Sequence, residues 1–159
     1  MKMSVEKLAM KYGSTCYISF ETALSYYCVI DQCIFKVSWA TLRDDFEFKY
    51  QNFLLEFINI DEDNFFGYMN MEGSFGDKIL YAEAEKAFVD WIWLYELRGW
   101  KIQLDEINWA VLSREKVDNY SKKMGINYLR YMVNIKEYKE CSHPKYAIIA
   151  QQQEQWLNS

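Results

Sequence analysis

The hydrophobic period of this chain changes twice along the sequence, and these changes constrain its fold more than any other feature. Between residues 19 and 30 the apolar side chains recur at helical spacing. In "CIFKVSW" and "FEFKYQ", which begin at residues 33 and 46, apolar and polar side chains alternate, which indicates half-buried strands. Helical spacing returns at residues 83–97. The sequence therefore predicts an α+β fold, in which helices 19–30 and 83–97 cover a mostly antiparallel sheet at residues 33–82.

Shorter patterns place the remaining elements. "FLLEFINI", "FFGYM" and "KILYA" predict three further strands, and the acidic turn "DEDN" at residues 61–64 follows the first of them. A short N-terminal helix is expected at residues 4–12. The C-terminal third is predicted to be helical, with one helix between Ser113 and Gly125. "INYLRYMVNIKEY" predicts a second helix and "KYAIIAQQQEQWL" a third, although the first five residues of the latter also suit a strand.

The helix at residues 83–97 carries a large share of the expected core. Its apolar side chains repeat at helical spacing and cover more than half of its circumference, so we expect Phe88 and Trp91 to face the sheet. Lys86 and Asp90 are spaced as i, i+4 neighbours, and an exposed pair of this kind adds only roughly a few tenths of a kcal/mol. We therefore interpret the charges of this helix as helix electrostatics on its solvent side.

Charge is distributed unevenly, and the distribution excludes one class of function. Residues 44–106 hold 15 acids and 5 bases, whereas residues 114–139 hold 7 bases and 3 acids. A protein that binds DNA over its whole surface would not carry such an acidic middle. Nucleic-acid binding through the basic helices at 114–139 stays open as an alternative. The phosphate contacts would then come from Arg114, Lys116, Lys122, Lys123 and Arg130.

The sequence offers few groups for catalysis or metal binding. The four cysteines form no Cys-x-x-Cys pair and His143 is the only imidazole, so no zinc site is expected. Cys141 and His143 lie two residues apart, which leaves a cysteine–histidine pair open without favouring it. We predict no catalytic residue, no metal and no cofactor. No apolar run has the length of a membrane span or of a signal-peptide h-region, so we expect a cytoplasmic protein without a membrane partner.

Three stretches, taken in order, resemble a known family. "YISFETALSYYCVI" (17–30) is similar to a Tyr-Ile-Ser-x-x-Ser/Thr-Ala-Leu-x-Tyr segment, and "FFGY" (65–68) follows at an appropriate distance. "ILYAEAEKAFVDWIWL" (79–94) is similar to a segment of the form Ile-x-x-Ala-x-x-Glu-Lys-Ala-Leu/Phe-x-Asp. In this order they resemble the C-terminal domain of the AbiEi family. The resemblance covers about residues 15–133 of a single domain, 1–159, in which 134–159 form a helical tail.

The resemblance implies a role in phage defence. AbiEi proteins are the antitoxins of bacterial type IV toxin–antitoxin systems, are encoded beside a nucleotidyltransferase-like toxin, and are often described as transcriptional regulators. It implies a soluble, non-enzymatic protein in which Glu85, Lys86, Ala87 and Asp90 belong to a structural signature helix. The family usually carries a winged helix ahead of this region. Only about a dozen residues precede the first motif here, too few for a winged helix, so we expect weak DNA binding.

The acidic turn is the candidate partner site. Toxins that act on nucleic acids tend to carry basic surfaces, and acids on the antitoxin would steer such a partner. We therefore expect Asp61, Glu62 and Asp63 to lie at the rim of a protein interface. The alternative for these acids is that they form only a solvated turn. The alternatives for the function are that the protein binds nucleic acid through residues 114–139, or that it is a small enzyme of an unrecognised kind.

Overall fold

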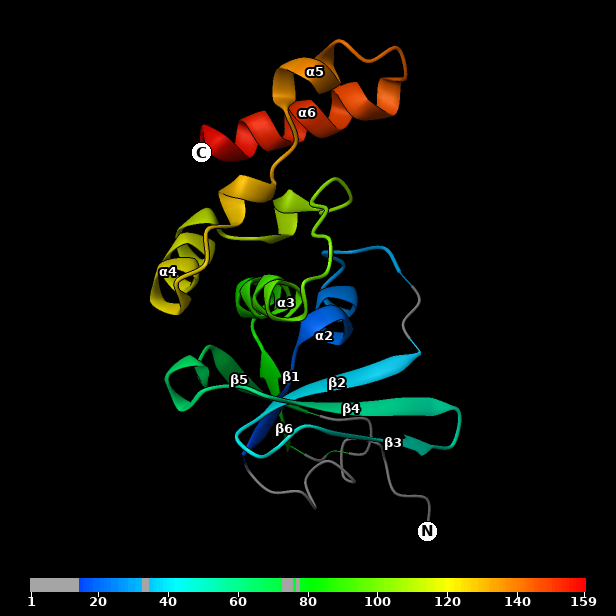
Figure 1. Cartoon of the computed structure of the whole chain (residues 1–159), viewed down its shortest axis with the longest axis vertical. Coiled ribbons are helices and arrows are strands. Elements are labelled where there is room, and N and C mark those ends of the chain that lie inside the picture. Colours follow the sequence, from blue (N-terminus) through cyan, green and yellow to red (C-terminus); the bar gives the residue numbers. More distant parts are fainter. Residues whose placement is uncertain (1–14, 33–34, 73–75, 77) are drawn as a thin grey trace.

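The chain folds as layers stacked on one six-stranded sheet (Figure 1). This computed structural model describes residues 15–32, 35–72, 76 and 78–159. The strands are β1 (Cys16–Ile18), β2 (Lys36–Thr41), β3 (Phe46–Tyr50), β4 (Phe53–Asn59), β5 (Tyr68–Glu72) and β6 (Lys78–Ala82). The α-helices are α2 (Phe20–Tyr26), α3 (Ala84–Arg98), α4 (Arg114–Met124), α5 (Ile135–Lys139) and α6 (Pro144–Leu157). Short 3-10 turns are η1 (Glu62–Asn64), η2 (Trp109–Val111) and η3 (Tyr128–Tyr131). The α+β class with a helical C-terminal part is confirmed.

The sheet is mixed, and its centre begins earlier in the chain than predicted. The strand order is β3-β4-β2-β1-β6-β5. Three neighbouring pairs are antiparallel, whereas β2 with β4 and β1 with β6 are parallel. The prediction of a sheet confined to residues 33–82 is wrong, because β1 lies at its centre. A strand of three residues is too short for alternation to reveal it in the sequence.

Alternation predicted the strands but understated the burial of the central ones. In β3 at the sheet edge, partly buried and exposed residues alternate as expected. In β2 and β4, by contrast, consecutive residues are buried, and alternate positions join two different core clusters. Ala40 and Ile58 belong to the cluster with α2 and α3, whereas Trp39 stacks on Phe57 in the other, at 4.8 Å between ring centroids. These two strands are therefore buried on both faces.

The first helix is shorter than its apolar pattern suggests. Helix α2 ends at Tyr26, because Cys28 adopts a left-handed backbone with φ of 60° and the N–H of Val29 turns back to Leu24 O. Ser19 occupies the N-cap position but forms no capping hydrogen bond through its side chain. The helix predicted at residues 4–12 lies outside the described residues.

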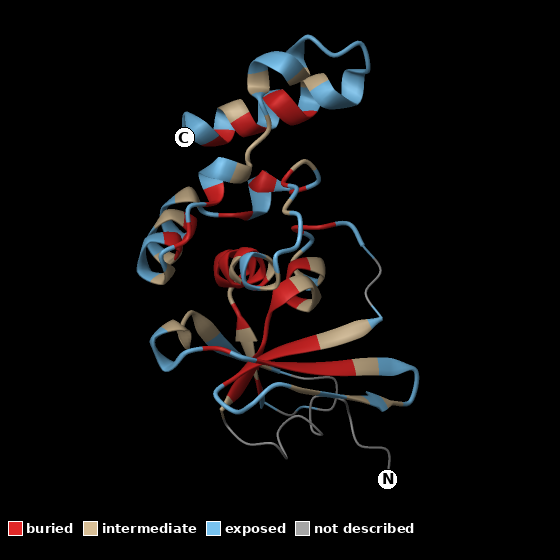
Figure 2. Ribbon diagram, viewed as in Figure 1, coloured by how far each residue is buried: buried red, intermediate tan, exposed pale blue. Residues whose placement is uncertain are grey.

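Helix α3 lies in the middle of the molecule and is buried along most of its length (Figure 2). It ends at Gly99, which adopts a left-handed conformation, close to the predicted end at residue 97. The prediction that Phe88 faces the sheet is wrong. The ring of Phe88 contacts Trp109 and Tyr128 of the C-terminal layer, at 5.5 Å and 5.8 Å between centroids. Trp91 lies on the same side of the helix, since its ring contacts Phe88.

The C-terminal third is helical, but one predicted helix is broken in two. Ser113 caps α4 and Gly125 ends it, as predicted. The segment predicted as one helix after Gly125 forms η3 and then α5, because the Asn134 side chain accepts the N–H of Glu137 and starts a new helix. Helix α6 excludes the strand alternative. Trp156 of α6 fixes this tail to the body by donating through Nε1 to the Tyr128 hydroxyl at 3.1 Å.

Truncation of Phe88 tests the central position of α3. Phe88 is fully buried, so Phe88→Ala should lower the free energy of unfolding by about 3–5 kcal/mol. Leu97 on the same helix is 68% exposed, and Leu97→Ala should change it by less than about 0.5 kcal/mol. Urea unfolding of both variants measures the difference. Equal stability of the two variants would show that Phe88 is not part of the core.

Candidate functional site

The three stretches that carry the family resemblance meet at one place in the fold. Tyr17 and Ser19 come from β1 and the start of α2, and Lys86 comes from α3. The hydroxyl of Tyr17 accepts a hydrogen bond from Lys86 Nζ at 3.0 Å. The ring of Phe66, from the second stretch, lies 4.5 Å from the same ammonium group. Residues far apart in the sequence thus surround one buried lysine.

Every polar group of this cluster has a partner. Lys86 Nζ donates to Asp90 Oδ1, to the Tyr17 hydroxyl and to the carbonyl oxygen of Asn64, the last at 2.8 Å. These three bonds use the full donor capacity of an ammonium group. Asp90 Oδ2 accepts from the hydroxyls of Tyr17 and Ser19, each at 2.8 Å. The Ser19 hydroxyl is therefore bonded to Asp90 and does not cap α2.

The Lys86–Asp90 pair is buried, and its interpretation as surface electrostatics is wrong. Both side chains are completely inaccessible to solvent. Burial lowers the pKa of Lys86, and the Asp90 carboxylate offsets this in part. Burial and the same carboxylate raise the pKa of Tyr17 well above its ordinary value. On α3, Lys86 and Asp90 point toward β1 and away from Phe88, which explains why the aromatic face turned to the C-terminal layer.

The cluster is closed to any substrate. Gly67 crosses directly over the lysine stem with φ of +74°, and a Cβ at this position would lie 2.8 Å from Lys86 Cγ. Only glycine fits such an approach and such a backbone angle. Phe66 covers the ammonium group from the same segment. The arrangement can therefore hold the turn and the helix together, but it offers no reactive group to a ligand.

His143 and Cys141, the candidate cysteine–histidine pair, each bond to a backbone group. His143 Nδ1 accepts the N–H of Lys145 at the start of α6, and Cys141 Sγ donates to Glu137 O. Within residues 15–32, 35–72, 76 and 78–159, no three histidine, cysteine or acidic side chains converge in a way that could hold a metal ion. Among the same residues, no helix has both the length and the apolar character of a bilayer span.

The acidic turn is exposed and held in a fixed position. Asp61, Glu62 and Asp63 are all exposed, and none forms an ion pair with a described residue. The backbone closes over η1, where the N–H of Asn64 donates to Asp61 O at 2.9 Å. The bond from Lys86 to Asn64 O ties this turn to the buried cluster. Three carboxylates are thus presented on a rigid support.

The basic residues predicted to contact phosphates do not form one face. Successive residues of a helix are rotated by roughly 100°, so Arg114 lies on the opposite side of α4 from Lys116 and Lys123. Arg114 pairs with Asp118, and Lys116 pairs with Glu83 at 2.9 Å. Lys122, Lys123 and Arg130 are all exposed; Lys123 lies over the ring of Phe66 and Arg130 over that of Tyr131.

The structure brings the two predicted sites next to each other. Helix α4 contacts η1, and the Lys123 ammonium lies 4.1 Å from the ring of Phe66, two residues after the acidic turn. A nucleic acid that approached the end of α4 would therefore meet Asp61, Glu62 and Asp63 as well. This arrangement weakens phosphate binding and leaves the acidic turn available to a basic partner.

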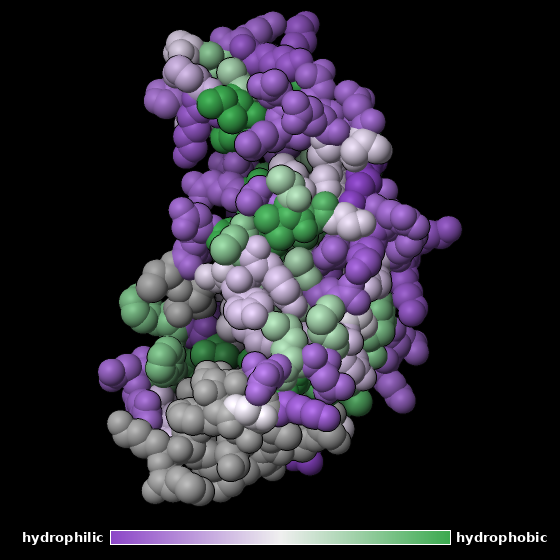
Figure 3. Space-filling model, turned by 180° about the vertical axis from the view of Figure 1, so that it is seen from behind, coloured by the Kyte–Doolittle hydropathy of each residue, from purple (hydrophilic) through white to green (hydrophobic). Residues whose placement is uncertain are grey.

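Exposed apolar side chains are spread over several elements. The most exposed large ones are Phe35, Leu97, Tyr26 and Ile148, which come from different parts of the fold. From behind, hydrophobic side chains form separate groups among hydrophilic ones (Figure 3). No single apolar patch on this face of the described residues marks an interface.

Comparisons of the chain with family models, with curated proteins and with solved structures found no match.

Replacement of the buried pair tests whether it acts as one unit. Lys86→Met leaves a buried carboxylate without its cation and should lower the free energy of unfolding by about 3–5 kcal/mol. The double variant Lys86→Met/Asp90→Leu should lose less than the sum of the two single variants, since neither charge then remains unpaired. Lys139→Met, which breaks an exposed pair with Glu154, should cost less than about 1 kcal/mol. Additive losses in urea unfolding would show that the pair is not coupled.

Nucleic-acid affinity tests the basic residues. Because these side chains are paired or dispersed beside an acidic turn, binding to duplex DNA should be micromolar or weaker at physiological salt. A gel-shift titration with the gene's own promoter measures it. Tight, sequence-selective binding would overturn this expectation and support the regulator alternative.

Proposed function

We propose that this chain is a non-enzymatic, antitoxin-like interaction protein of a bacterial type IV toxin–antitoxin or phage-defence system, acting in the cytoplasm on a protein partner with a basic surface. One observation carries the proposal. Asp61, Glu62 and Asp63 are exposed, have no ion-pair partner among the described residues, and lie on a turn that Lys86 holds in place. Such a turn presents, in a fixed geometry, three carboxylates without ion pairs to the described residues.

Fixed carboxylates favour association in two ways. Their field raises the rate at which a basic partner meets this surface. Their rigidity reduces the entropy that binding would otherwise cost, because the turn is already ordered. The resemblance of the chain to the AbiEi family supports the kind of partner, a nucleotidyltransferase-like toxin encoded nearby. The enclosed Lys86–Asp90 cluster supports a role without catalysis, since its polar groups are fully engaged with one another.

Growth rescue tests the proposal. The protein is co-expressed with an adjacent nucleotidyltransferase-like gene, and the unmodified chain should restore growth. The triple variant Asp61→Lys/Glu62→Lys/Asp63→Lys should lose rescue, and the rate of association with the purified toxin should fall by about tenfold or more. All three residues are exposed, so the fold should be retained.

A matched variant controls for net charge. Glu47, Glu137 and Glu140 are exposed acids on other elements, and their change to lysine alters the total charge by the same amount. This control should still rescue growth. Failure of the unmodified protein to rescue would count against the antitoxin role. Full rescue by the acidic-turn variant would reject the turn as the binding surface and leave the role standing.

A further inference from the structure

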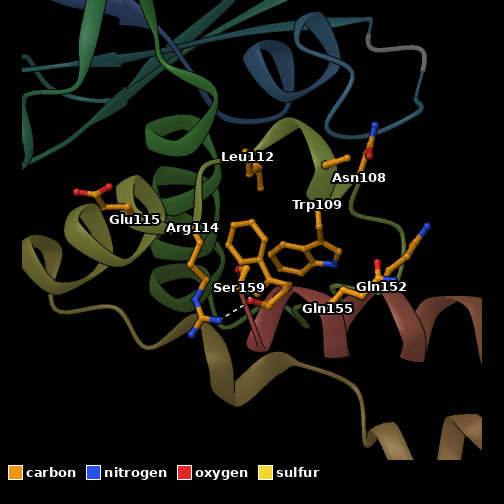
Figure 4. A pocket seen from close by; sticks show the side chains of 10 residues that line it. Asn108, Trp109, Leu112, Arg114, Glu115, Gln152, Gln155 and Ser159 are labelled. Atoms are coloured by element: carbon orange, nitrogen blue, oxygen red, sulfur yellow. Dashed lines mark hydrogen bonds between the residues drawn. The ribbon is translucent and has the colours of Figure 1, made fainter.

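A hollow of about 780 Å³ lies where the C-terminal tail meets the body of the protein (Figure 4). Residues of η2, the start of α4 and the last turns of α6 enclose it. Trp109 and Trp156 belong to the core, are each 6% exposed, and reach the hollow with a small part of their surface; their ring centroids lie 4.7 Å apart. We call this hollow the tryptophan pocket. Its volume is in the range of sites that take a large side chain or a small ligand.

The rim of the tryptophan pocket carries carboxamides that are free to bind. Gln152 and Gln155 lie one turn apart on α6, both exposed, and neither bonds to another described residue. Gln153 between them shows the contrast, since it is buried and bonds Val133 N–H and Leu104 O with its two ends. The indole N–H of Trp109 also has no acceptor within the described part of the chain. The pocket thus offers hydrogen-bond donors and acceptors beside a small apolar surface.

The charges around the tryptophan pocket disfavour an anionic ligand. Arg114 is its one lining cation, and this guanidinium is already engaged by Asp118 and by the carbonyl of Trp156. A smaller hollow of about 350 Å³ shares Asn108 with the pocket and is lined by Asp31 and Glu106. Glu106 has a distant partner in Lys145 at 3.7 Å. A phosphate in the pocket would be repelled by Glu115, which lines it, and by the carboxylates of the neighbouring hollow, whereas a lysine or arginine side chain would be attracted by them.

We propose that the tryptophan pocket binds an extended peptide segment of a protein partner. One apolar side chain of the segment enters the hollow beside Trp109 and Trp156, and its main-chain amide bonds to Gln152 and Gln155. A carboxamide matches the peptide unit because each has one donor side and one acceptor side. A basic residue beside the anchor lies toward Asp31. The identity of this partner as the toxin rests on the proposed function, whereas peptide binding itself does not.

Titration with short peptides tests the pocket directly. The probe is N-acetyl-Lys-Phe-Lys-amide, followed through the side-chain amide and indole signals of the labelled protein by NMR. Signals of Gln152, Gln155 and Trp109 should shift with a millimolar Kd, and N-acetyl-Glu-Phe-Glu-amide should bind at least about tenfold more weakly. Absence of shifts with the basic peptide, or stronger shifts with adenosine monophosphate, would overturn the proposal, the latter in favour of a nucleotide site.

Variants on one helix separate the pocket from the fold and from the antitoxin role. Gln152→Leu/Gln155→Leu should weaken the basic peptide by about tenfold. Gln151→Leu, an exposed glutamine of α6 outside the pocket, should leave its affinity unchanged. Equal affinity in all variants would reject the carboxamide contacts. Growth rescue that survives the double variant would separate peptide binding from toxin binding, and peptide binding without any rescue would reject the proposed function alone.

Discussion

The ion pair between Lys86 and Asp90 is the interaction on which the arrangement of this protein depends. Two charges without solvent access cost several kcal/mol each unless all their hydrogen bonds are made. Here the partners come from β1, from the segment after β4 and from α3, so the charges are satisfied only when these three parts are in place. A purely apolar contact would allow several orientations of α3, whereas the hydrogen bonds of this network are all formed in only one orientation.

The same network links packing to the surface. The Lys86 stem leaves no room for a side chain at Gly67, and its ammonium group holds the carbonyl of Asn64. The acidic turn is consequently fixed by a residue that never reaches solvent. The aromatic side of α3 is then free to pack on Trp109 and Tyr128, which carry the C-terminal layer and the tail. One buried pair thus orients both the proposed binding turn and the support of the tryptophan pocket.

Sequence patterns predicted what local chemistry determines. The alternation in β3, the cap at Ser113 and the stop at Gly125 each depend on neighbouring residues, and each was predicted correctly. The position of β1 and the direction of Phe88 depend on residues distant in sequence, and they were not. The sequence did contain a sign that Lys86 is buried, since it lies in a helix that is apolar over more than half its circumference. Its i, i+4 spacing with Asp90, however, is also typical of an exposed ion pair, and this led to the wrong interpretation. For the candidate site, exposure of the turn and the i, i+4 pair of Arg114 with Asp118 follow from local sequence, whereas the pairing of Lys116 with Glu83, 33 residues earlier, needed the tertiary structure.

The central position of the short strand β1 has a consequence for how the chain reaches its native state. Ile18 pairs with Tyr81 across the middle of the sheet, and the Tyr17 hydroxyl bonds a carboxylate 73 residues later. Closing a loop of that length costs entropy before any contact compensates for it, which slows folding. During synthesis the N-terminal part emerges first. Until β6 and Asp90 have left the ribosome, β1 can pair only with β2, so its other edge and the Tyr17 hydroxyl remain without their native partners.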